Sequence, residues 1–112
     1  MACKKGDIYL VNFDSTIGSE VKKTRPAVIV SNNINNANSP IVSIAPITSN
    51  VSKIYSFEVE LPAGLGRLVK RSKVMVNQVR AVDKDRLIKY IGSVDESILD
   101  KINQALKLHY DL

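Results

Sequence analysis

A succession of short β-branched and aromatic segments, followed by one segment with helical periodicity, constrains the fold of this chain more than any other feature. The segments predicted as strands are residues 8–13, 26–30, 41–47, 55–61, 73–79 and 87–91. Strands this short need neighbours in order to bury a hydrophobic face. The pattern therefore predicts a mainly β fold, a small and partly open antiparallel barrel, with one terminal helix.

Some strand segments carry more specific expectations. The first is apolar at both odd and even positions, which predicts burial on both faces of the sheet. Pro46 is expected to mark a sheet edge, a bulge or the end of its strand, because proline cannot donate a ladder hydrogen bond. The fourth segment alternates between apolar and polar residues, so Phe57, Val59 and Leu61 should face inward.

The end of the chain predicts one amphipathic helix over residues 94–108. Ser93 and Glu96 form the S-x-x-E pattern of a capping box, which begins many helices. Apolar residues then recur every three or four positions, with His109 at the end of the stripe. We expect the stripe to pack on the sheet, and His109 to be a structural or rim residue and not a catalyst.

Length and composition limit the possible classes of protein. At 112 residues the chain is expected to form one domain, residues 1–112. A single cysteine, Cys3, excludes an intrachain disulfide, and a single histidine excludes an HExxH metal site and a paired-histidine mechanism. No apolar run approaches a membrane span and no signal peptide is visible, so we expect a cytoplasmic protein with Cys3 reduced. The net charge of +5 favours a polyanionic partner.

Three connecting segments hold candidate functional residues. Residues 14–24 form a long connection between two apolar strands, and long ordered loops are often functional. Residues 48–50 form a hydroxyl-rich strand exit. Residues 62–72 hold several basic side chains, and no acidic residue lies between positions 61 and 82. A basic cluster taken alone is as typical of a solvated surface as of a binding site.

Short motifs in a fixed order reveal a resemblance along almost the whole chain. They are Lys5-Gly6-Asp7-Ile8-Tyr9, Gly18-Ser19-Glu20, Arg25-Pro26-Ala27-Val28, Ala45-Pro46-Ile47-Thr48-Ser49 and Gln78-Val79-Arg80. Each motif is weak alone, but the ordered set is specific. From about Lys4 to the C-terminus the chain closely resembles the MazF/PemK toxins, the mRNA interferases of type II toxin–antitoxin systems.

The resemblance implies a fold, an activity and partners. The fold is the SH3-like barrel shared with the CcdB toxins, and the active form is a homodimer. The activity is sequence-specific, metal-independent and ribosome-independent cleavage of single-stranded mRNA, in which the 2′-OH attacks and leaves 2′,3′-cyclic phosphate and 5′-OH ends. No cofactor is implied. The inhibitor is an antitoxin with an acidic, disordered tail, either MazE-like or of an unrelated DNA-binding type.

The resemblance also assigns roles to individual residues. Arg25 and Thr48 match catalytic positions, since a guanidinium suits a phosphate in bidentate geometry and a hydroxyl can donate to a non-bridging oxygen. Glu20 is the carboxylate best placed to accept the 2′-OH proton. The resemblance implies RNA contacts at two polar residues, and the charge pattern adds basic ones around the phosphate. These expected RNA-binding residues are Ser19, Gln78, Lys22, Lys23, Arg67, Lys70, Arg71 and Lys73. No metal ligand is assigned.

At two positions the chain departs from the family pattern, and the first of these leaves the identity of the general base open. Many relatives have an acid immediately before the glutamine, where this chain has Asn77, and this shifts the role of base to Glu20 or to solvent. Ala81 stands where relatives commonly have threonine. Both differences are interpreted as changes of specificity or rate, because Arg25 and Thr48 are retained.

Two other functions are compatible with the same barrel. A non-enzymatic toxin that inhibits DNA gyrase, as CcdB does, would act through the C-terminal helix and cleave no RNA. A plain nucleic-acid-binding barrel would account for the positive charge and the basic loops, but it gives Glu20 and Thr48 no role. The presence of both Arg25 and Thr48 in the expected motifs argues against the gyrase inhibitor.

Overall fold

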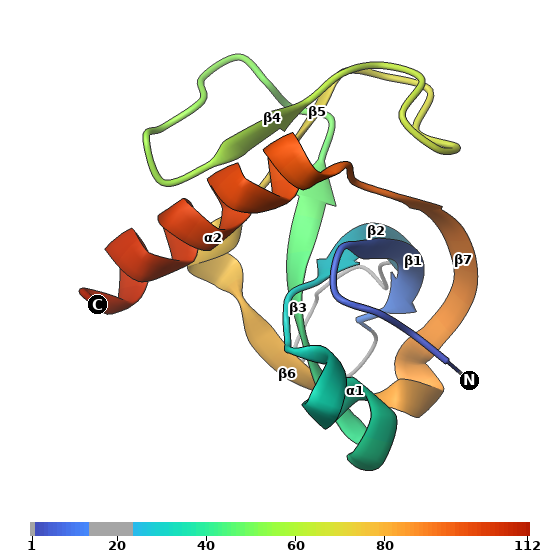
Figure 1. Ribbon diagram of the computed structural model, residues 1–112. Helices are drawn as coiled ribbons and strands as arrows, with labels where there is room; N and C mark the ends of the chain where they lie inside the picture. The colour runs from blue at the N-terminus through green and yellow to red at the C-terminus, as the bar shows by residue number, and fades with distance from the viewer. Residues whose placement is uncertain (1, 14–23) are drawn as a thin grey trace, which may run out of the picture.

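Residues 2–13 and 24–112 are described by a computed structural model, in which seven short strands form one curled antiparallel sheet (Figure 1). In chain order the elements, with η for a 3-10 helix, are β1 (Asp7–Asn12), β2 (Thr24–Ile29), α1 (Asn33–Asn38), β3 (Ile41–Thr48), β4 (Val59–Leu61), β5 (Ser72–Val74), η1 (Val76–Gln78), β6 (Arg80–Asp83), η2 (Lys84–Arg86), β7 (Leu87–Ser93) and α2 (Glu96–Tyr110). The strand order is β4-β5-β3-β2-β1-β7, and β6 pairs with β3. The predicted mainly β, partly open barrel with a C-terminal helix is confirmed.

The central strands β1 and β2 are buried on both faces. Ile8 and Val28 belong to one core together with Ile102 of α2, the helix that lies across one side of the sheet in Figure 1. Tyr9 and Ile29, each one residue further along its strand, belong to a second core. Because side chains alternate between faces, a strand between two cores must be apolar at both parities. The two-sided burial predicted for the first strand is confirmed.

Strand β3 changes partner along its length. Its first four residues pair with β6, whereas its last two pair with β5. Pro46 lies between these two pairings, and its carbonyl accepts a hydrogen bond of 2.8 Å from the Met75 N–H. The strand therefore continues through the proline to Thr48. The proline marks the change of partner, where its missing N–H interrupts neither ladder.

The fourth predicted strand is shorter than expected. The Glu58 N–H donates to the Tyr55 carbonyl at 2.9 Å, which closes a turn directly before β4. The apolar residues inside β4 are buried as predicted. Phe57 precedes the strand and is half-buried, with its ring stacked on that of Tyr55. The apolar–polar alternation in the sequence therefore extends beyond the strand. Two aromatic residues stacked in a turn, two positions apart, give the same alternation as one face of a strand.

The segment predicted as one strand over residues 73–79 divides into β5 and η1, and β6 was not predicted. The N–H groups of Gln78 and Val79 donate to the carbonyls three residues before them, at 3.0 and 3.1 Å. These tight bonds end the extended conformation after β5. Within β6 only Val82 is buried, so this short strand at the edge of the sheet has no period-two signal.

Helix α2 begins at a different cap from the one predicted. Its N-cap is Asp95, whose carboxylate accepts a hydrogen bond of 2.9 Å from the Ile98 N–H, and this bond lowers the pKa of Asp95. Ser93 instead ends β7, where its hydroxyl donates to the Asp7 carboxylate at 3.0 Å. The predicted capping box is wrong, because aspartate caps a helix as well as serine does and Ser93 is used in the sheet.

The apolar stripe of α2 packs against the sheet as predicted. Ile98, Ile102 and Ala105 are buried, and His109 lies at the exposed end of the helix against Tyr110. In the part of the chain that the structure describes, no helix is long and apolar enough to cross a membrane.

Candidate active site

Arg25 and Thr48 lie on two neighbouring strands and line one cleft. The ladder between β2 and β3 pairs Ala27 with Pro46. Arg25 on β2 and Thr48, the last residue of β3, each lie two residues beyond this pair. Both side chains are partly exposed and line one cleft. The sheet therefore brings together the two residues predicted to be catalytic.

The cleft has a volume of about 430 Å³ and combines cations with apolar side chains. Arg67 and Lys70 come from the connection between β4 and β5 and line the cleft together with Arg25. Its apolar part includes Leu10, Ile47, Leu68 and Ile91. None of the described residues that line it is acidic. Three cations around one hollow attract a polyanion such as a phosphodiester chain.

The hydroxyl of Thr48 is held by the loop that follows it. The Asn50 N–H donates to Thr48 Oγ1 at 3.2 Å. This bond uses a lone pair of the oxygen, so the hydroxyl hydrogen is left to donate to a ligand. Ser49 also lines the cleft. The strand exit that the sequence marked as hydroxyl-rich thus supplies a hydrogen-bond donor beside the Arg25 guanidinium.

Arg71 and Lys73, also predicted to bind RNA, do not line the cleft and are paired with acids. Arg71 forms an ion pair with Glu60, and their hydrogen bond lowers the pKa of Glu60 and raises that of Arg71. Lys73 Nζ lies 2.9 Å from Glu58 Oε1 and 2.7 Å from the Lys53 carbonyl oxygen. The side chains of Lys73 and Glu58 are only 11% and 6% exposed. A role of these two cations in RNA binding stays a prediction.

Gln78 and Asn77 lie on η1 and do not line the cleft either. The exposed Gln78 places its Nε2 group 3.4 Å from the sulfur of Met75. Asn77 lines a separate hollow with Phe57 and His109. The departure from the family pattern at Asn77 therefore lies outside the cleft of this chain, and base reading by Gln78 stays a prediction.

Four of the predicted site residues lie in a part of the chain that the structure does not describe. Ser19, Glu20, Lys22 and Lys23 lie outside the described residues, so their roles stay predictions. Within residues 2–13 and 24–112, no group of three or more His, Cys, Asp and Glu side chains is arranged to hold a metal ion. The cleft itself offers cations and hydroxyls, which do not suit a divalent cation.

Sequence reasoning missed the apolar part of the cleft. Leu10, Leu68 and Ile91 come from β1, the loop after β4 and β7, and only the fold brings them together. The sequence gives no signal for Leu10, because only the structure shows that it is partly exposed while its neighbours in the strand are buried. Nothing in the local sequence marks Leu68 or Ile91 as site residues.

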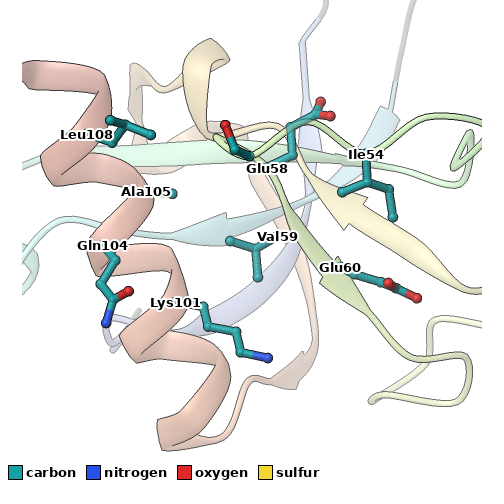
Figure 2. Close-up of a pocket in the computed structure, with 9 residues that line it drawn as sticks. Ile54, Glu58, Val59, Glu60, Lys101, Gln104, Ala105 and Leu108 are labelled. Carbon is teal, nitrogen blue, oxygen red and sulfur yellow. The ribbon is translucent and has the colours of Figure 1, made fainter.

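A second hollow, of about 490 Å³, lies between α2 and β4 (Figure 2). Ala105 and Leu108 of the helix lie on one side of it, and Glu58 and Glu60 lie on the other. None of the predicted site residues that the structure describes lines it. This hollow has one cation, Lys101, and two carboxylates, whereas the cleft at Arg25 has three cations and no described acid, so the cleft at Arg25 is the better candidate for binding a phosphodiester.

Comparison with known proteins identifies the family of this chain. A family model described as PemK-like, MazF-like toxin of type II toxin-antitoxin system matches residues 4–110. The endoribonuclease MazF9 of Mycobacterium tuberculosis is 38% identical over 114 residues, with 97% of each chain covered. The endoribonuclease EndoA of Bacillus subtilis is 32% identical, with 96% of this chain and 94% of that protein covered.

Solved structures agree with the sequence comparison. MazF from Deinococcus radiodurans superposes with a TM-score of 0.83 at 26% identity, covering 100% of this chain and 99% of that one. A MazE-MazF structure from the same organism has a TM-score of 0.83 at 26% identity and covers 100% and 98%. The family match over nearly the whole chain, the curated relatives and the common fold lead to one conclusion: the chain belongs to the PemK-like, MazF-like toxins of type II toxin–antitoxin systems.

Proposed function

We propose that this chain is a metal-independent, ribosome-independent endoribonuclease that cleaves single-stranded mRNA at the cleft between β2 and β3. The observation that carries the proposal is that Arg25 and Thr48 line one cleft together with further cations and no described acid. The relatives that are named endoribonucleases support the reaction class.

The RNA would supply its own nucleophile in this reaction. The 2′-OH attacks the adjacent phosphorus, the bond from phosphorus to the 5′-oxygen breaks, and the products end in a 2′,3′-cyclic phosphate and a 5′-OH. Negative charge grows on the non-bridging oxygens, where the Arg25 guanidinium can donate two hydrogen bonds and Thr48 a third. Arg25 is not the base, because its guanidinium carries only N–H donors and has no acceptor atom for a proton. Its role is charge stabilisation, together with proton donation to the leaving 5′-oxygen.

The general base remains Glu20 or solvent in this proposal. Glu20 belongs to the Gly18-Ser19-Glu20 motif, five positions before Arg25 in the sequence. Asn77 cannot accept a proton at neutral pH, and it lines a different hollow. Replacing Glu20 by glutamine should therefore lower the cleavage rate about 10²-fold without changing RNA affinity, which is typical of the loss of a base.

The partners follow from the same charge pattern. A cationic cleft that binds RNA also suits the acidic tail of an antitoxin, and MazE-MazF structures are known for the Deinococcus relative. We propose that the active form is a homodimer, that one cognate antitoxin inhibits it by occupying the cleft, and that it acts in the cytoplasm, where mRNA is available.

The decisive test is cleavage of a mixed-sequence single-stranded RNA by the purified protein in EDTA, with the product ends identified by mass spectrometry. We expect cuts at one short sequence with cyclic-phosphate ends. Arg25→Ala and Thr48→Ala should each lose at least about 10²-fold in rate. Arg80→Ala is the matched control, because Arg80 is exposed and stacks on Phe13 away from the cleft.

Other outcomes would contradict the proposed mechanism or identify another function. Cleavage that requires Mg²⁺, or that survives in Arg25→Ala, contradicts the mechanism. Inhibition of DNA gyrase without RNA cleavage would identify a non-enzymatic toxin on the same fold. Salt-sensitive binding of RNA without cleavage would identify a plain nucleic-acid-binding barrel.

A further inference from the structure

The loop that carries Arg67 and Lys70 is fixed to strand β7, which lies far from it in the sequence. The Arg67 N–H donates to the Ile91 carbonyl at 3.0 Å. That carbonyl is available because β7 has an irregularity here: Ile8 of β1 pairs with Gly92, but the next residue of β1 pairs with Tyr90. Ile91 is the extra residue of a bulge, which is left out of the ladder. The bulge therefore offers the loop a backbone acceptor.

Two glycines make this contact possible. A Cβ atom on Gly92 would lie 2.8 Å from the Gly66 Cα, and a Cβ on Gly66 would lie 2.5 Å from the Ile91 carbonyl oxygen. Both distances are shorter than side chains tolerate, and the atoms met are backbone atoms that cannot rotate away. A methyl group at position 92 must therefore push the loop away from β7.

The loop is held at its other end as well. Leu68, only 7% exposed, packs into the main core beneath the loop. Ser72 is 3% exposed, and its hydroxyl donates to the Lys70 carbonyl at 2.9 Å. Between these anchors the side chains of Arg67 and Lys70 line the cleft. The backbone positions of Arg67 and Lys70 are thus fixed before any ligand arrives.

We infer that Gly92 is a positioning residue for RNA binding, acting through its contact with Gly66. It holds Arg67 and Lys70 where they bind RNA phosphates that flank the phosphate held by Arg25. The inference rests on the proposed function, since it names which groups of the same cleft bind the RNA backbone. A cation fixed in advance binds a phosphate more tightly than one on a free loop, because less conformational freedom is lost on binding.

The experiment measures the affinity of the full chain for a 2′-O-methyl RNA oligonucleotide, which has no nucleophile, at several salt concentrations. Arg67→Ala combined with Lys70→Ala should reduce the slope of log K against log salt by about 1.4. Gly92→Ala should reduce the slope by about 1 and weaken binding about fivefold, although it removes no charge. In the doubly substituted background, Gly92→Ala should change the affinity less than about 1.5-fold, because the cations it positions are gone.

A matched control separates positioning from loss of stability. Ile102→Val trims the core under α2 and should lower the melting temperature while leaving the salt slope unchanged. With cleavable RNA, Gly92→Ala should raise KM about fivefold and change kcat less than twofold. If Gly92→Ala does not fold, Ser72→Ala releases the other end of the loop and should show the same reduced slope.

Several results would overturn the inference. One is an unchanged salt slope in folded Gly92→Ala, and another is equal weakening by Gly92→Ala in the wild-type and doubly substituted backgrounds. Absence of salt-dependent RNA binding by the wild type refutes both this inference and the proposed function. Binding of the oligonucleotide without cleavage of unmodified RNA refutes the proposed function alone, and the substitution cycle then still decides whether Gly92 positions the cations.

Discussion

The basic residues near the β4–β5 connection form two groups that differ in what they contact. Arg67 and Lys70 join Arg25 around the cleft, and within residues 2–13 and 24–112 none of these cleft cations forms an ion pair. Arg71 and Lys73, the paired cations, each contact a glutamate of the neighbouring chain segment. The two groups are adjacent in sequence, and yet only the first faces a hollow that has no described acid.

The start of strand β5 separates the groups. Ser72 is the first residue of β5 and is buried, so the next residue, Lys73, points to the opposite face of the sheet. Arg71, directly before the strand, forms its ion pair with Glu60 of β4. Glu58 and Glu60 pair with these two cations and neutralise their positive charges. Arg67 and Lys70 lie earlier, in the loop between β4 and β5, and they line the cleft. A run of basic residues is therefore not one surface, and its contribution to polyanion binding depends on which cations already have an acid partner.

Arg25→Lys tests the centre of the cleft and should have the largest effect. Lysine keeps the positive charge but cannot form two parallel hydrogen bonds to a phosphate, so kcat for RNA cleavage should fall about 10²-fold. The measurement is single-turnover cleavage at saturating RNA, with circular dichroism to show that the fold is kept. Full activity of Arg25→Lys would mean that a point charge suffices, and the bidentate role would then be wrong.

Lys73→Ala tests the paired group and should act on stability. The substitution leaves the Glu58 carboxylate, whose side chain is 6% exposed, without its cation, and we expect a loss of about 2 kcal/mol in the free energy of unfolding by urea. Combining Lys73→Met with Glu58→Gln removes both charges and should recover much of the loss. Arg71→Ala is the matched control and should cost far less, because its ion pair is exposed. An equal loss in Arg71→Ala would contradict the difference in burial.

Lys70→Ala and Arg71→Ala compare neighbouring residues from the two groups. Lys70→Ala should weaken binding of single-stranded RNA about fivefold at low salt and reduce the salt slope by about 0.7, whereas Arg71→Ala should weaken it less than twofold. Fluorescence anisotropy with a labelled RNA at three salt concentrations measures both values. Equal effects of the two substitutions would place both groups on the RNA path.

The sequence predicted the fold well where a strand is defined by its own burial. The two-sided apolar pattern of the first strand and the apolar stripe of α2 both correspond to real packing. Prediction from the sequence failed where contacts with residues outside the segment decide its structure. Ser93 caps no helix because Asp7 of β1 takes its hydroxyl, and β6 shows no pattern because only Val82 is buried in it.

The candidate site divides in the same way. Arg25 and Thr48 could be named from motifs, and they line the same cleft in the structure. The division of the basic cluster could not be predicted, because it depends on glutamates that belong to another segment and on the direction of the Ser72 side chain. The role inferred for Gly92 depends on a bulge in β7, and a glycine in a strand gives no signal of the loop that will approach it.

Glu60→Gln leaves Arg71 without its acid partner, so that Arg71 becomes unpaired like the cleft cations. This substitution should have the smallest effects. Removing the Glu60 charge releases Arg71, so affinity for single-stranded RNA should rise about twofold and the salt slope should steepen by up to about 0.7. No rise in affinity would mean that Arg71 is too far from the RNA path to contribute even when it is unpaired.

The pH dependence of stability gives an independent check on the same pair. The hydrogen bond from Arg71 lowers the pKa of Glu60 below its usual value of 4.5. A carboxyl with a lowered pKa stabilises the fold fully above its usual pKa, and this stabilisation is lost as the pH falls through the lowered value. The melting temperature of wild type should therefore exceed that of Glu60→Gln slightly at pH 7, and the difference should shrink below pH 4.5 until it disappears at lower pH. A difference that stays constant as the pH falls would show that the glutamine disturbs packing, because an effect of side-chain shape does not depend on the charge of Glu60.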